Sequence, residues 1–254
     1  MLTSTYIHIP GIGKETERKI WSGGITTWND FLQNKSSINL PDSKKDKIAM
    51  EIENSIEKLE IRDIPYFAKS IPTSEHWRGF RNFSDSVAYV DIETTGLSPS
   101  SSKITVIGVY DGKDVKSFVR GINLEEIVQE MEQYDFLVTF NGARFDLPFI
   151  QREFPQITMG QMHTDLMYPL RRIGFKGGLK NIEHMLGINR SEETEGMDGF
   201  EAVRLWKEYE KGNEKALDLL LEYNREDIVN LETILDITYE RFVEHCYKGC
   251  TPQK

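Results

Sequence analysis

The sequence has few of the residues that cross-link a chain or anchor it in a membrane. It contains only two cysteines, Cys246 and Cys250, among 254 residues, and no run of about 18 apolar residues. Without a second pair of ligands these cysteines do not make a zinc site, and we expect free thiols in a reduced, cytoplasmic protein. The first residues lack the charged and apolar regions of a signal peptide. Neither a disulfide-stapled fold nor a membrane-spanning fold is therefore expected.

The chain is also short of positive charge. It has 31 Lys and Arg against 41 Asp and Glu, a net charge of −10. Residues 1–85 hold 12 of each sign, so residues 86–254 hold 19 against 29 and carry the whole excess. Such a balance is unusual for a protein that binds nucleic acid, unless some carboxylates hold cations that neutralise them. Strong nonspecific binding of nucleic acid at high salt is not expected.

Carboxylates occur instead in three short motifs of the second part of the chain. The first motif holds Asp91 and Glu93, the second ends at Asp146, and the third runs from Tyr223 to Asp227. Hard divalent cations such as Mg²⁺ or Mn²⁺ take oxygen ligands. Two of them about 4 Å apart stabilise both the attacking and the leaving oxygen of a phosphodiester. The motifs therefore indicate a site for two divalent cations and hydrolysis of a phosphodiester.

The spacing within each motif predicts where the side chains point. Residues 86–93 form a β-branched, apolar run typical of a buried strand, so Asp91 and Glu93 face the same way. Residues 217–242 have apolar positions at helical spacing, so Tyr223 and Asp227, four apart, share a helix face. Asp146 follows a second strand-like run, 136–140, near the start of a predicted helix, where backbone N–H groups favour an anion.

With these motifs the chain resembles the 3′–5′ exonucleases of the ribonuclease-H-like superfamily, in the tyrosine variant of their four-carboxylate site (DEDDy). Residues 91–96, 141–146 and 223–227 match the three motifs in order. The other variant has a histidine five residues before the last aspartate, where this chain has Glu222. Residues 147–150 continue the second motif as in the proofreading domains of B-family DNA polymerases. A closer resemblance, over residues 86–243, is to the YprB-like domains.

The resemblance implies roles for individual residues. Asp91, Glu93 and Asp227 would hold the first metal ion, Asp91 would bridge to the second, and Asp146 would support that second ion. Tyr223 would orient the attacking water rather than deprotonate it, because a free phenol titrates near pH 10. The product would be a nucleoside 5′-monophosphate. Further residues are candidates for contacts with the substrate: Thr94, Leu97, Asn141, Phe145, Lys176 and Lys180.

Most of these residues also have an ordinary structural reading. Asp146 is suited to capping a helix, Tyr223 to a half-buried place on one, and Asn141 to a turn beside Gly142. Leu97 is either a wedge against a terminal base or a core leucine. The basic stretch that includes Lys176 and Lys180, together with Arg171, Arg172 and Arg190, is either a phosphate site or a solvated loop.

The remaining strand signals predict a mixed sheet. Residues 103–110 and 115–119 are strand-like and are joined by the tight turn Asp111-Gly112, which is typical of an antiparallel hairpin. The later alternation of strands and helices favours parallel pairing. The fold class is therefore α/β, a ribonuclease-H-like mixed sheet flanked by helices, with a small N-terminal all-α module.

The N-terminal part resembles the helix-hairpin-helix module of DNA-binding proteins over about 24 residues. Gly11 and Gly13 allow a close approach of backbones, and the helix that follows them presents N–H groups to a phosphate. Lys14 adds a point charge, whereas Glu15 and Glu17 would oppose one. The alternative is a small helical bundle, including a polar helix over residues 41–60, that packs on the catalytic domain.

These observations predict four segments: a helical module (1–72), a linker (73–85), an exonuclease domain (86–245) and a tail (246–254). Within the linker, Trp77, Phe80 and Phe83 are expected to pack as anchors. We expect a metal-dependent 3′–5′ exonuclease whose partner is DNA, single strands above all, with RNA as a second possibility and no membrane partner. The alternatives are a binding protein with little turnover and an endonuclease of the same fold. The oligomeric state stays open.

Overall fold

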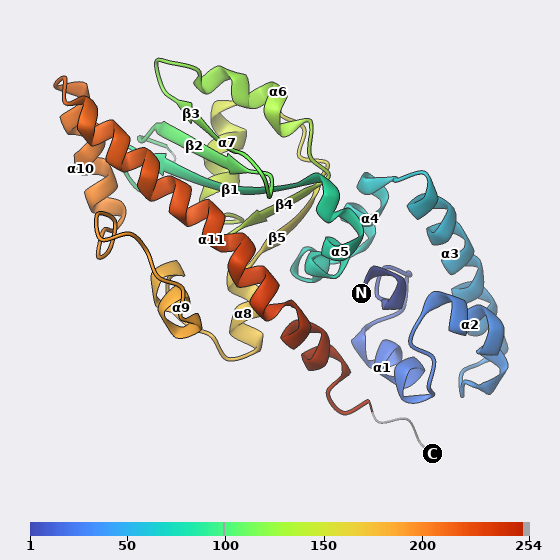
Figure 1. Ribbon diagram of the computed structural model, residues 1–254. Coiled ribbons are helices and arrows are strands. Elements are labelled where there is room, and N and C mark those ends of the chain that lie inside the picture. The colour runs from blue at the N-terminus through green and yellow to red at the C-terminus, as the bar shows by residue number, and fades with distance from the viewer. Residues whose placement is uncertain (99, 251–254) are drawn as a thin grey trace.

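The computed structural model describes residues 1–98 and 100–250. A five-stranded sheet in the order β3-β2-β1-β4-β5 lies between layers of helices (Figure 1). β1 pairs antiparallel with β2 and parallel with β4, β2 pairs antiparallel with β3, and β4 pairs parallel with β5. The predicted hairpin, the parallel pairing and the mixed α/β architecture are confirmed. The strands are β1 Val87–Thr94, β2 Ile104–Tyr110, β3 Val115–Val119, β4 Phe136–Thr139 and β5 Met162–Asp165.

β1 is the central strand and is buried on both faces, as its nearly continuous apolar sequence requires. Val90 and Ile92 pack in a core cluster with α6 (Ile127–Met131) and α7 (Asp146–Glu153). Tyr89 packs in the cluster on the other side, which includes residues of α11 (Glu214–Tyr247). Alternation along the strand therefore turns Asp91 and Glu93 toward α11.

The helix α11 crosses one face of the sheet and is longer than the predicted 217–242 (Figure 1). Its buried positions recur at helical spacing from Ala216 to Phe242. At the sheet, Gly108 of β2 lets the helix approach closely, because a Cβ on this glycine would lie 2.0 Å from Oδ1 of Asn224. The remaining helices of this part are η5 (Leu124–Glu126), α8 (Met167–Arg172), α9 (Leu179–Leu186) and α10 (Gly199–Glu210).

The N-terminal residues form a helical group beside the last turns of α11 (Figure 1). Trp21, Trp28 and Phe31 are almost fully buried there, and the predicted helix over residues 41–60 is confirmed as α3. The elements are η1 (Leu2–Ser4), α1 (Lys14–Ser22), α2 (Trp28–Asn34), η2 (Lys35–Ser37), α3 (Asp42–Glu60) and α4 (Ile64–Ser70).

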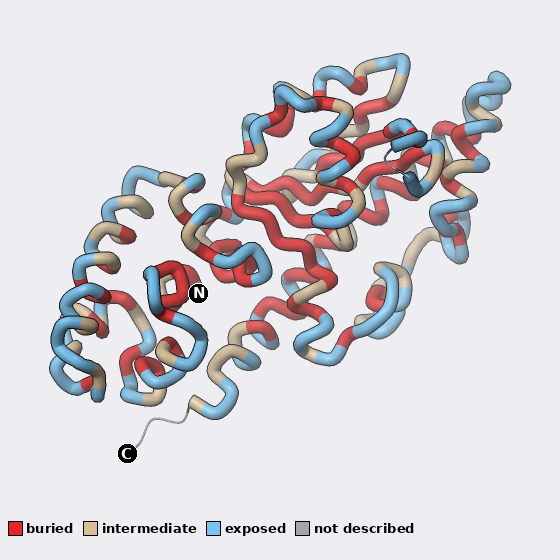
Figure 2. Tube along the Cα trace, turned by 180° about the vertical axis from the view of Figure 1, so that it is seen from behind, coloured by how far each residue is buried: buried red, intermediate tan, exposed pale blue. Residues whose placement is uncertain are grey.

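Residues 73–85 fold into η3 (Thr73–Gly79), α5 (Phe80–Phe83) and η4 (Ser84–Ser86). Trp77, Phe80 and Phe83 are buried, as expected of anchors, and this segment contacts β5 and the N-terminal helices. Figure 2 shows the buried strands of the sheet and the largely exposed outer helices. The division of the chain into module, linker and domain stays a prediction.

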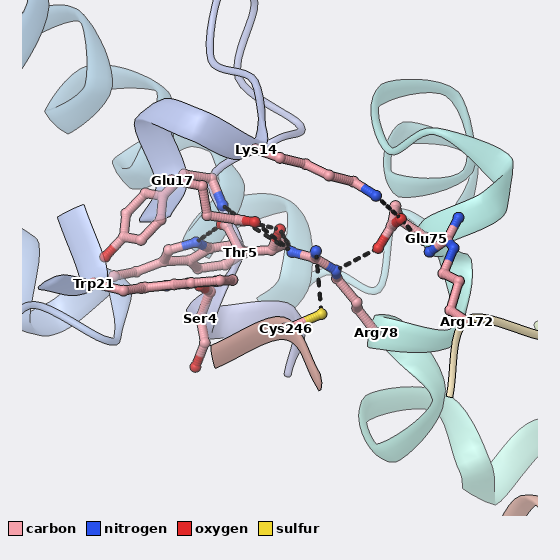
Figure 3. A network of polar contacts seen from close by, with 11 residues as sticks. Ser4, Thr5, Lys14, Glu17, Trp21, Glu75, Arg78, Arg172 and Cys246 are labelled. Atoms are coloured by element: carbon pink, nitrogen blue, oxygen red, sulfur yellow. Dashed lines mark hydrogen bonds and ion pairs between the residues drawn. The ribbon is translucent and has the colours of Figure 1, made fainter. Parts of the chain in front are cut away.

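A buried ionic network joins the N-terminal helices to the segment 73–79 (Figure 3). Arg78 Nη1 donates to both carboxylate oxygens of Glu17 at 2.9 Å, and its Nε donates to Glu75 at 2.9 Å. Glu75 also pairs with Lys14 of α1 and Arg172 of α8. Because buried charges need partners, the network fixes α1 against the rest of the molecule.

Within the residues described, no helix is both long and apolar enough to cross a bilayer.

Candidate metal centre

Three of the predicted ligands converge at the C-terminal end of β1. Carboxylate oxygens of Asp91, Glu93 and Asp227 all lie within 4.8 Å of one another. Asp91 and Glu93 come from β1, and Asp227 comes from the face of α11 that covers this strand. The positions predicted from i, i+2 and i, i+4 spacing therefore meet across the interface between strand and helix.

Asp146 stands beside this group, at the first residue of α7 as predicted. Its Oδ1 accepts a hydrogen bond from the backbone N of Ile92, at 3.0 Å. Ile92 lies between the two strand ligands, so this bond ties the second motif to the first. Asp146 is not among the carboxylates that share the 4.8 Å group, and it is only 3% exposed.

The carboxylates have raised pKa values because they are buried close together. Burial, followed by the charges of neighbouring carboxylates, raises the pKa of Asp91 and of Glu93 well above the ordinary range. Burial raises the pKa of Asp146 to about 7 and that of Asp227 to about 6, the latter against the opposing effect of Arg190. Divalent cations would relieve this repulsion, and carboxylate oxygens are the donors that hard cations prefer. The donor set fits such ions.

Tyr223 lies one helical turn before Asp227 and is buried. The ammonium of Lys180, at the start of α9, lies 4.4 Å from the centroid of its ring. Burial and the nearby carboxylates of Asp227 and Glu93 raise the pKa of the phenol. Tyr223 therefore keeps its proton at neutral pH and is suited to donating or orienting a hydrogen bond. The structure thus brings Tyr223 and Lys180, two predicted site residues, to the carboxylate group.

Asn224 is a site residue that the sequence analysis did not single out. Its Nδ2 donates to Oδ2 of Asp91 at 3.0 Å, and the side chain is fully buried. The space for it comes from Gly108, as described above. The only signal in the sequence was its place inside the third motif, next to Tyr223.

Arg190 lies at the carboxylate group, and its contact with a substrate phosphate stays a prediction. It donates to Glu183 through Nε and Nη2, both at 2.7 Å, and through Nη2 also to Asp227. Asn230 Nδ2 donates to Glu183 at 2.9 Å, and the Arg190 side chain is only 5% exposed. Two buried carboxylates converge on this position, so the guanidinium pairs with them rather than facing solvent.

The second motif forms a turn held by Asp165, which the sequence analysis also missed. Asn141 has a φ of 62°, and Asp165 accepts from the backbone N of Asn141 at 2.7 Å and of Ala143 at 3.2 Å. A Cβ on Gly142 would lie 2.3 Å from the hydroxyl of Thr139, so a glycine is required there. The turn aims the chain toward Asp146, and Asn141 occupies the turn position that its residue type allows.

The other predicted substrate contacts have varied surroundings. Thr94 donates to the backbone oxygen of Gly96 at 2.7 Å and shapes the turn after β1. Leu97 is 72% exposed, so the interpretation as a core leucine is wrong. The Phe145 ring packs on Phe149 with centroids 4.9 Å apart. Lys176 is exposed in the loop before α9. Their contacts with a substrate stay predictions.

The glycines of the N-terminal motif lie before α1, in a different part of the molecule from the carboxylates (Figure 1). Gly11 has a φ of +87° and Gly13 caps the helix. Lys14 is half-exposed and pairs with Glu75. Glu17, expected to oppose a phosphate, is instead buried against Arg78. Of the two acids considered there, only Glu15 is exposed.

Comparison with protein families identifies the chain. The RNase_H superfamily model matches residues 88–239. This match covers more than half of the chain and includes every carboxylate of the site. The protein therefore belongs to the RNase_H superfamily.

The individual proteins similar to this chain that are described next share 28% identity with it or less. The uncharacterised protein MJ0365 of Methanocaldococcus jannaschii is 28% identical over 159 residues, which cover 56% of this chain and 88% of that protein. Among solved structures, the family B DNA polymerase of Pyrobaculum calidifontis is 16% identical with a TM-score of 0.49, over 60% of this chain and 24% of the polymerase. The chain thus spans about a quarter of that polymerase. NrnC of Brucella melitensis is 20% identical with a TM-score of 0.45, over 67% of this chain and 81% of NrnC.

Proposed function

We propose that this protein is a metal-dependent 3′–5′ exonuclease that releases nucleoside 5′-monophosphates from nucleic acid, single-stranded DNA above all. The observation that carries the proposal is the convergence of Asp91, Glu93 and Asp227 within 4.8 Å. Membership of the RNase_H superfamily supports a nuclease. Tyr223, one turn from Asp227, supports the tyrosine variant of the four-carboxylate site.

The residues of the chain divide into metal-binding and orienting groups. Asp91, Glu93 and Asp227 would hold one Mg²⁺ or Mn²⁺, and Asp91 with Asp146 would hold a second. Bound divalent cations supply an acidified water and stabilise charge on the phosphate oxygens. Asn224 holds one oxygen of Asp91 in place through its amide.

Two further side chains act on the substrate rather than on the ions. Tyr223 keeps its proton and orients the attacking water through its hydroxyl. Lys180 places its ammonium 4.4 Å from the tyrosine ring centroid, where it would neutralise part of the charge of the reacting phosphate. The helix-hairpin-helix-like segment with Gly11, Gly13 and Lys14 would contact a phosphate away from the active site.

A panel of labelled strands tests the proposal directly. DNA and RNA, single-stranded and duplex, labelled at the 5′ end, are incubated with Mg²⁺ or Mn²⁺, and the products are sized. We expect shortening from the 3′ end one nucleotide at a time, with release of 5′-monophosphates, and no cleavage in EDTA.

Two controls separate this proposal from the alternatives. A closed circular single strand offers no end, so its cleavage would indicate an endonuclease. Strand binding without release of any nucleotide, under all metal conditions, would indicate a binding protein. The variant Asp91→Asn, with one charge removed from the metal ligands, shows whether a contaminating nuclease causes the activity.

A further inference from the structure

The ionic network around Arg78 joins the N-terminal helices to the rest of the protein. The side chains of this network that reach solvent are all cationic. Side chains of Glu17 and Glu75 are each 1% exposed, and that of Arg78 is 2% exposed. Lys14 and Arg172 both pair with Glu75 (Figure 3). Their side chains are 50% and 33% exposed. Because its carboxylates are buried, the network presents positive charge to solvent on the two sides of Glu75, from Lys14 of α1 and from Arg172 of α8.

Arg172 also lines a groove of about 760 Å³ between α8 and the C-terminal end of α11. The groove is lined by three cationic side chains, Arg172, Arg241 and Lys248, and by one acidic side chain, Glu244. Arg241 packs with its guanidinium 5.7 Å from the centroid of the Phe175 ring, which restrains it. The groove therefore carries an excess of positive charge on a protein whose net charge is −10.

The helix α11 connects this groove with the metal centre. Tyr223 and Arg241 are 18 residues apart, which is five turns at about 3.6 residues per turn, so they share one face of the helix. Lys248 follows seven residues later, directly after the helix ends at Tyr247. At about 1.5 Å per residue, Arg241 lies about 27 Å along the axis from Tyr223. At a stacked spacing of about 3.4 Å per phosphate, this length corresponds to about eight nucleotides.

We propose that this groove, with Lys14 at its margin, binds the phosphodiester backbone of a strand whose 3′ end lies in the metal centre. The inference rests on the proposed function and adds a second contact region to it. A backbone with regularly spaced anionic phosphates fits a groove that holds three cationic side chains and a single acid. Short strands occupy the metal centre alone, and longer strands reach the groove.

The test compares the full-length chain with the double variant Arg241→Gln, Lys248→Gln. Binding of labelled single-stranded DNA of five and of twenty nucleotides is measured in EDTA over a range of KCl concentrations. Each phosphate contact of a single strand adds about 0.7 to the slope of log K against log salt. We expect the variant to lose about 1.4 from the slope for the longer strand and nothing from that for the shorter one.

The control variant is Arg204→Gln, Lys211→Gln. It removes two exposed cations, Arg204 in α10 and Lys211 directly after that helix. It changes the net charge equally and is expected to keep the wild-type slope. An unchanged slope in the groove variant, an equal loss in the control, or no length dependence in the wild type would each overturn the groove assignment. An unchanged salt slope in the groove variant would mean that the groove binds another polyanion, such as an acidic protein surface.

The nuclease assay separates this inference from the function on which it rests. If the wild type hydrolyses strands and the groove variant keeps its salt slope, only the groove assignment fails. If the wild type binds with the expected slopes but hydrolyses nothing with Mg²⁺ or Mn²⁺, the proposed exonuclease activity fails and the binding surface stands.

Discussion

Asn224 donates a hydrogen bond to Asp91 across 3.0 Å, from a helix to the strand that it covers. The amide of a buried side chain thereby holds one carboxylate of the candidate metal centre in a single orientation. Gly108 is part of the same arrangement, because any larger residue there would collide with Asn224.

Asn224→Ala should therefore weaken metal binding. A hydrogen bond to a charged group is worth about 1.5–3 kcal/mol, so we expect the affinity for Mn²⁺ alone to fall about tenfold or more. Titration calorimetry measures it, and Gly108→Ala should have the same effect because it displaces the amide. Asn189→Ala, at an exposed position, is the control. Wild-type affinity in both site variants would show that Asn224 only packs.

Asp91→Asn should abolish cleavage without unfolding the protein. The substitution removes one charge from a group of buried carboxylates that repel one another, so thermal stability without metal should stay the same or rise. Mg²⁺ should raise the melting temperature of the wild type, because a ligand of the folded state stabilises it, and should raise that of the variant less. Near-normal turnover of the variant with Mg²⁺ would show that the site is misplaced.

Tyr223→Phe should slow the chemical step while substrate affinity stays about the same. The ring keeps its packing and only the hydroxyl is lost, and positioned acid–base groups contribute roughly 10²–10⁴-fold in rate. Single-turnover kinetics with a short strand separates the rate from binding. A rate equal to that of the wild type would make Tyr223 a packing residue.

Arg190→Gln should destabilise the fold more than the removal of any exposed arginine. The change leaves Glu183 and Asp227 buried without their shared cation, and breaking a buried ion pair costs about 3–5 kcal/mol. Urea unfolding in EDTA measures the loss. Arg204→Gln breaks an exposed pair and should cost about 1 kcal/mol or less. Equal losses in the two variants would show that the buried pair contributes no more than a surface contact.

The contribution of His8 to stability should fall as the pH drops from about 6.5 to about 4, whereas the raised pKa values of the metal-centre carboxylates act in the opposite direction. Burial lowers the pKa of His8 to about 4, whereas a histidine in the unfolded chain titrates near 6.5. Between these values His8 of the unfolded chain binds more protons than His8 of the folded chain, so this residue makes the free energy of unfolding rise with pH. The stabilisation is complete above about pH 6.5 and is lost toward pH 4.

His8→Asn tests this origin of the pH dependence. Urea unfolding at several pH values should show a slope smaller by roughly 1.4 kcal/mol per pH unit than in the wild type within that window. The exposed His184 provides the control His184→Gln, whose slope should follow the wild type. A wild-type slope in the His8 variant would place the dependence on other groups, such as His163, whose pKa burial lowers to about 3.

Local sequence determined the elements that carry the site. Alternation along β1 placed Asp91 and Glu93 on one side, and helical spacing placed Tyr223 with Asp227. These relations follow from the fixed geometry of strand and helix. They were visible in the sequence because each concerns residues within one element, and the ordered motifs were enough to indicate the superfamily.

Contacts between elements were decided only by the tertiary structure. Asn224 meets Asp91 because Gly108 lets α11 approach the sheet, and Arg190 turns inward because Asp227, 37 residues later, joins Glu183 in pairing with it. No local pattern encodes such meetings, since a charged residue in a loop is exposed by default. The sequence by itself determined which groups this protein has for its chemistry, and the packing of α11 on β1 decided which residues hold those groups in place.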